Sequence, residues 1–227
     1  GGRGGGGGRG GGGDPNVQAE LQPMLNQMFM EATGILRRVE DFDSMPDVAD
    51  DLFLLAAKCL SHAPHLLLTP QNLPALVDCA MAGVLVQHKE ACTSVLAFLD
   101  QLCRDCTRHP QVVPPTIQVR GQALVHLLVA AIATLPFARL DDVGDLLHHL
   151  MRTECSGGMA PSWVQTTMAA LPAAAVTDHE RVGFYNAAVA MDRKQLQHAI
   201  DDLSDVCRRS RGVRESIMAA LLHHPTS

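Results

Sequence analysis

The chain has 227 residues, of which 47% are hydrophobic and only 4% aromatic, and its formal net charge at pH 7 is −6. The apolar residues are mainly Leu, Ala, Val and Met, a composition that favours helices over β-sandwiches. The acidic balance argues against a direct nucleic-acid-binding function, because neutralising phosphates requires a basic face.

The first thirteen residues are 11 Gly and 2 Arg. Glycine has no side chain to bury and loses the most entropy on ordering, so we expect residues 1–16 to be a disordered Gly/Arg-rich linker. No charged start followed by an apolar core marks a signal peptide. The seven cysteines are therefore expected to be reduced, intracellular thiols.

After residue 16 the apolar residues recur at helical spacing. Leu73, Leu76, Val77, Ala80, Met81 and Val84, for example, fall at offsets 0, 3, 4, 7, 8 and 11. Thr177 and Glu180 have capping-box spacing, and Pro46 sits where a first helical turn tolerates proline. Ten helices are predicted, over residues 22–40, 46–62, 72–86, 89–107, 116–135, 139–153, 160–171, 178–191, 193–208 and 212–223.

Short connections between these helices predict antiparallel neighbours. Five pairs correspond to about 43 residues per pair, within the range of HEAT and armadillo repeats. We therefore predict an all-α fold in which residues 17–227 form an α-solenoid of five HEAT-like helix pairs; a compact helical bundle is the alternative. The apolar segment from Ala123 to Leu135 is too short to span a bilayer, so no membrane association is expected.

The sequence shows no catalytic motif and no complete metal site. Cys103 and Cys106 form a C-x-x-C pair without a second ligand pair, and packing is the simpler role for them. His148 and His149, like the adjacent pair at 223–224, point apart on a helix and are expected to be surface residues. We predict no enzyme activity and no cofactor; a metal- or thiol-dependent helical enzyme is a remote alternative.

Two charged segments are candidate partner-binding surfaces. One is acidic and has no Lys or Arg between Val39 and Lys58; the other is basic and lies near the last turn between helices. Favourable charge placement at helix ends accounts for part of both segments. The functional hypothesis is that the acidic segment binds an Arg-rich partner and that the basic segment binds an acidic or phosphorylated partner. The candidate residues are Glu40, Asp41, Asp43, Asp47, Asp50 and Asp51, and Arg208, Arg209, Arg211 and Arg214.

Three stretches go beyond periodicity: DDLFLLA from Asp50 to Ala56, LVDCAMAGVLVQHKEACTSVLAFL from Leu76 to Leu99, and DLSDVCRR from Asp202 to Arg209. Together they resemble the C-terminal part of transportin-SR-type nuclear import receptors of the importin-β superfamily, the plant and green-algal branch above all. The resemblance extends over most of residues 20–223.

This resemblance implies a HEAT-repeat receptor that shuttles between cytoplasm and nucleus and imports protein cargo, including Arg/Ser-rich splicing factors. Nucleoporins would be further partners, and no cofactor is needed. Ran would bind N-terminal repeats that this chain lacks, so we expect a fragment or a truncated product. A generic HEAT-repeat scaffold for another protein complex is the alternative function.

Overall fold

The computed structural model describes residues 15–222, with side chains from residue 20 onward. Within this range the chain forms thirteen α-helices, two short 3-10 helices and no strand. The α-helices are α1 (Pro15–Ile35), α2 (Val39–Ser44), α3 (Pro46–His62), α4 (Pro64–Leu67), α5 (Asn72–Gly83), α6 (Lys89–Arg104), α7 (Val113–Thr134), α8 (Leu140–Met151), α9 (Thr153–Ser156), α10 (Ala160–Ala170), α11 (Asp178–Val189), α12 (Arg193–Arg208) and α13 (Arg211–Leu222).

Nine of the ten predicted helices match an observed helix to within three residues at each end. The first, over 22–40, is wrong: α1 ends at Ile35 and a separate helix α2 starts at Val39. Helix α1 begins at Pro15, within the last two residues of the predicted linker. Residues 1–14 lie outside the described residues, so the linker prediction stays a prediction there.

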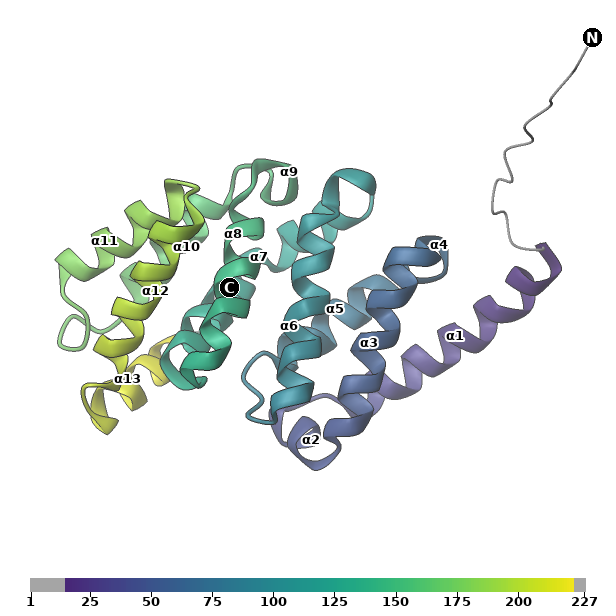
Figure 1. Ribbon diagram of the computed structural model, residues 1–227, viewed down its shortest axis with the longest axis horizontal. Helices are drawn as coiled ribbons and strands as arrows, with labels where there is room; N and C mark the ends of the chain where they lie inside the picture. The colour runs from purple at the N-terminus through teal and green to yellow at the C-terminus, as the bar shows by residue number, and fades with distance from the viewer. Residues whose placement is uncertain (1–14, 223–227) are drawn as a thin grey trace, which may run out of the picture.

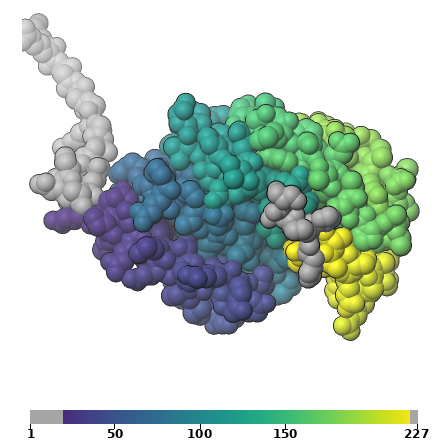
Figure 2. Space-filling model, turned by 180° about the vertical axis from the view of Figure 1, so that it is seen from behind, coloured from purple at the N-terminus to yellow at the C-terminus, as the bar shows by residue number. Residues whose placement is uncertain are grey.

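The helices stack in two layers, which Figure 1 shows as a row of near-parallel rods. Helices α3, α6, α8 and α12 follow one another in one layer, and α1, α5, α7 and α10 follow one another in the other. Figure 2 shows that chain order follows the long axis of the molecule, with α1 at one end and α11 at the other. The predicted all-α solenoid of helix pairs is confirmed.

Polar contacts between successive helix pairs show the repeat length directly. In the first layer, side chains link α3 to α6, α6 to α8 and α8 to α12 across 40, 49 and 48 residues. In the second layer, they link α1 to α5, α5 to α7 and α7 to α10 across 46, 42 and 45 residues. These separations agree with the predicted period of about 43 residues per pair.

The row folds back on itself at its C-terminal end. Helix α13 packs against α7, and α12 contacts α7 as well as α8. Helix α7 therefore has neighbours on several sides, and twelve of its 22 residues are buried. It starts ten residues before the apolar segment predicted from the sequence. By length and composition alone α7 is therefore long enough to cross a membrane, but it packs as a core helix of the solenoid.

Candidate protein-interaction surfaces

Helix α2 and the start of α3 carry the predicted acidic segment on their solvent side. Glu40 and Asp43 are exposed on α2, and Asp47 and Asp51 are exposed one turn apart on α3. None of these four carboxylates forms an ion pair with any of the described side chains. We call this set of four the acidic surface; its charge is free to meet a partner. Asp50 is half-buried and lies at its edge.

Asp41 belongs to the predicted set but serves the fold. Its carboxylate accepts hydrogen bonds from the backbone N–H groups of Arg37 and Arg38 at 3.1 and 2.9 Å, and it pairs with the Arg38 guanidinium at 3.5 Å. Burial works to raise the pKa of Asp41, but the two backbone N–H groups and the Arg38 guanidinium together lower it. This carboxylate stabilises the N-terminus of α2 and already has hydrogen-bond and ion-pair partners.

An aromatic stack holds the acidic surface against the solenoid. Phe42 is fully buried and stacks on Phe53 with ring centroids 6.4 Å apart, and Phe53 in turn lies 5.6 Å from Phe98 of α6. The Phe42 ring also lies against the backbone of Gly83, where an added Cβ would come within 2.4 Å of it. A six-residue helix alone is unstable in water, so these contacts position the carboxylates of α2.

All four arginines of the predicted basic segment are exposed, but they differ in the contacts that their guanidinium groups make. Arg208 donates to the carbonyl of Leu135 and to Ser204 Oγ, and its guanidinium lies 4.8 Å from the centre of the Phe137 ring. Its charge fastens the end of α12 to the segment after α7. The guanidinium of Arg208 is thus already engaged by contacts within the fold.

The other three arginines differ in how far they are engaged. Arg209 pairs with Glu180 of α11 at 2.7 Å. Arg211 pairs with Glu215 at 2.6 Å, and both side chains are largely exposed. Arg214 is exposed and makes no ion pair within residues 20–222. Arg211 and Arg214 are therefore the two arginines of this segment that make no side-chain contact with another helix.

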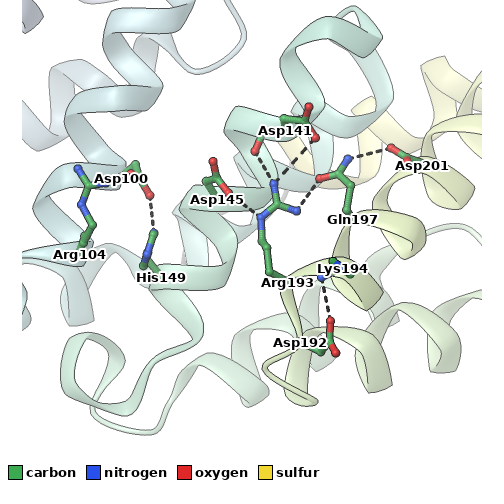
Figure 3. Close-up of polar contacts among 10 residues, drawn as sticks. All are labelled: Asp100, Arg104, Asp141, Asp145, His149, Asp192, Arg193, Lys194, Gln197 and Asp201. Atoms are coloured by element: carbon green, nitrogen blue, oxygen red, sulfur yellow. Dashed lines mark hydrogen bonds and ion pairs between the residues drawn. The ribbon is translucent and has the colours of Figure 1, made fainter.

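Two histidines predicted to lie on the surface are half-buried. His149 Nδ1 lies 2.6 Å from an Asp100 carboxylate oxygen, which joins α8 to α6 (Figure 3). Burial lowers the pKa of the neighbouring His148. Further along the layer, Arg193 of α12 contacts Asp145 at 2.6 Å, and Figure 3 shows its guanidinium inserted between α8 and Gln197. These residues connect neighbouring pairs of the solenoid.

The cysteines are all buried and none is in a disulfide. Burial raises the pKa of Cys79 to about 12 and those of Cys92 and Cys207 to about 11, so these thiols are poor nucleophiles. Cys103 and Cys106 pack near Cys155 of α9, and the hydrogen bond with Cys103 lowers the pKa of Cys155. Across the described residues no group of His, Cys, Asp or Glu is arranged to hold a metal ion.

The structure also contains a groove that the sequence reasoning missed. It lies between α11 and α12 and has a volume of about 530 Å³. One face of α12 lines it at helical spacing, through Gln195, His198, Asp202, Asp205 and Arg209. This polar stripe, at offsets 0, 3, 7, 10 and 14, was visible in the sequence. The sequence did not show that α11 faces this stripe across the groove.

Comparison with known proteins agrees with this architecture. No protein-family model matches the chain. Transportin MOS14 of Arabidopsis thaliana is 37% identical to it over 218 residues, which cover 92% of this chain and 22% of that protein. The chain is thus similar to one segment of a transportin. It spans about a fifth of the length of that relative, and the similarity supports the predicted importin-β-type relationship without fixing the transportin-SR subtype.

Proposed function

We propose that the chain is part of a nuclear import receptor of the importin-β superfamily and that it contributes a surface for protein cargo. The 37% identity to a transportin over nearly the whole chain carries this proposal. The stacked helix pairs support it, because such solenoids present extended surfaces to other polypeptides. A receptor of this kind binds and releases proteins, has no catalytic site and shuttles between cytoplasm and nucleus.

The acidic surface supports a proposal for the class of cargo. Four exposed carboxylates without ion-pair partners in the described residues lie on α2 and α3, and α2 is held in place by Phe42. Such a surface suits an Arg-rich, unfolded segment, because complementary charge speeds the encounter and the segment can adapt on binding. Arg/Ser-rich proteins, the class that transportin-SR-type receptors import, fit this chemistry. Ran and nucleoporin contacts are assigned to the longer receptor.

The first test measures binding of a fluorescent Arg–Ser repeat peptide, unmodified and phosphorylated, to the full 227-residue chain. The double variant Asp47→Asn/Asp51→Asn should bind the unmodified peptide about fivefold more weakly, since each exposed charge pair contributes up to about 1 kcal/mol. Binding of the wild-type chain should weaken as salt rises.

The matched control is Glu90→Gln/Glu154→Gln, which removes the same charge from the first turns of α6 and α9. It should bind the peptide within twofold of wild type. Equal losses in the two double variants would show that only the net charge matters, and would remove the acidic surface from the proposal. Stronger binding of the phosphorylated peptide would instead favour the exposed pair Arg211 and Arg214.

Import itself is tested in a chimera. Residues 20–222 replace the aligned segment of the Arabidopsis transportin, and nuclear accumulation of an Arg/Ser-rich reporter is measured in permeabilised cells. Accumulation at the level of the parent transportin supports the import function. A chimera that folds and binds Ran but imports no reporter would favour the alternative, a HEAT-repeat scaffold for another complex.

A further inference from the structure

The groove between α11 and α12 has an apolar floor. Phe184 of α11 and Leu203 and Val206 of α12 form it, and each is at most 4% exposed. Half-buried Ala199 continues the floor along α12. On the α11 side, Gly183 has no side chain to close the groove, and an added Cβ there would meet no atom within 4 Å. A side chain from outside can therefore reach the floor.

The rim of the groove is acidic. Asp202 and Asp205 are exposed one turn apart on α12, and neither forms an ion pair with another described residue. Glu180 and Arg209 lie across the groove from one another and neutralise each other at 2.7 Å. The remaining rim side chains are Gln195, His179 and His198, and none of them carries a negative charge. At pH 7 the rim thus has two uncompensated negative charges above an apolar floor.

We propose that this groove binds a peptide segment of a partner protein in which an apolar side chain is flanked by Arg or Lys. The apolar side chain enters over Gly183 and covers Phe184 and Leu203, and the flanking cations meet Asp202 and Asp205. The volume of about 530 Å³ admits a few side chains, so the segment binds through a short anchor and not as a whole helix.

This site is separate from the acidic surface and does not depend on the proposed function. Helices α2 and α3 lie towards one end of the row and α11 and α12 at the other (Figure 1). The chemistry also differs, because Arg–Ser repeats contain no apolar residue to fill the groove. A partner that uses both sites would gain from binding two surfaces at once.

The test uses three fluorescent 12-residue peptides and the full chain. One peptide alternates Arg with Leu, one alternates Arg with Ser, and one alternates Glu with Leu. The Arg–Leu peptide should bind at least tenfold more tightly than either of the others. Equal binding of the Arg–Leu and Arg–Ser peptides would overturn the proposal, since charge alone would then explain it. No binding of the Arg–Leu peptide up to millimolar concentration would overturn it as well.

A second experiment fills the groove with a side chain. Gly183→Leu places a side chain in the open space above the floor and should weaken Arg–Leu binding at least tenfold. Gly212→Leu is the control, because Gly212 is also a helical glycine with open space around it. This control should leave binding unchanged. Equal effects of the two variants would overturn the proposal, and circular dichroism of each variant verifies the helical fold.

The acidic rim is tested separately with Asp202→Asn/Asp205→Asn. Arg–Leu binding should weaken several-fold and depend less on salt, whereas binding of the Arg–Ser peptide at α2 and α3 should not change. A loss for both peptides would place them on one surface and overturn the separate site. Failure of the acidic-surface variants described above would leave this result intact, so the two proposals fail independently.

Discussion

Three carboxylates at helix starts show how single residues set the ends of the helices. Backbone N–H groups of Gln195 and Lys194 lower the pKa of Asp192, and the Thr177 backbone does the same for Glu180. Asp41 acts similarly at α2. The capping box of Thr177 and Glu180, predicted from the sequence, is confirmed: the Thr177 N–H donates to Glu180 at 2.7 Å, and the Glu180 N–H donates to the Thr177 hydroxyl at 3.3 Å.

These lowered pKa values predict loss of stability in acid. A carboxyl whose pKa is lower in the folded than in the unfolded chain stabilises the fold above its unfolded pKa, near 4.5 for Glu180, and this contribution is lost as pH falls through the folded value. Glu180→Gln should therefore be less stable than wild type in urea at pH 7. The difference should shrink towards pH 3. A difference that is equal at both pH values would contradict the role of the ionised carboxylate.

Met191, between α11 and α12, has a left-handed backbone with φ of 55°. A side chain there costs about 1–2 kcal/mol, whereas glycine adopts this conformation freely. Met191→Gly should therefore raise the free energy of unfolding by roughly 0.5–1 kcal/mol, after the entropy that glycine loses on folding. Ala190→Gly, at the adjacent residue with φ of −66°, should lower it instead. Urea unfolding of both variants checks the pair, and two changes of the same sign would contradict the argument.

At the scale of elements, the sequence predicted helices well and their contacts poorly. Apolar periodicity is local, so nine helices were placed to within three residues. Helices α4 and α9 are four residues each, too short to show a period. Pro64 separates α3 from α4 and begins α4, because a first helical turn tolerates proline.

Candidate binding residues were chosen by charge, and charge alone does not show which side chains already have a partner within the molecule. The hydrogen-bond partner of Arg208, the Leu135 carbonyl, is 73 residues away in the sequence, so no local pattern predicts this contact. Asp41, by contrast, contacts Arg37 and Arg38 within four residues, so the missed break between α1 and α2 had a local signal. The α11–α12 groove needed the tertiary structure, because its two walls come from different helices.

Gly121 provides a test of helix packing. Helix α7 meets α10 there, and a Cβ on Gly121 would lie 2.2 Å from the Trp163 ring. Gly121→Ala should therefore lower the free energy of unfolding by about 1–3 kcal/mol through overpacking. Gly183→Ala, the same change in open space on α11, should raise it by roughly 0.5–1 kcal/mol. Denaturant unfolding distinguishes them, and a stabilising Gly121→Ala would contradict the close approach of α7 and α10.

At the scale of the whole molecule, the two ends of the solenoid are unlike. Helix α1 packs mainly on α5, and its outer side exposes Met24, Met28 and Ile35. At the other end, α12 and α13 fold back onto α7 and cover it. Because each pair contacts chiefly its neighbours, we expect stability to vary along the chain instead of being shared equally.

Hydrogen exchange followed by mass spectrometry measures this variation. Amides of α1 should exchange first, because one face of the helix has no neighbour among residues 15–222, and amides of α7 should exchange last, because α5, α6, α8, α10, α12 and α13 surround it. Arg193→Met removes the contact between α12 and Asp145, so it should speed exchange in α11 and α12 while α1 and α3 stay unchanged. A uniform increase over all helices would instead show that the molecule unfolds as one cooperative unit, which contacts made chiefly between neighbouring pairs do not predict.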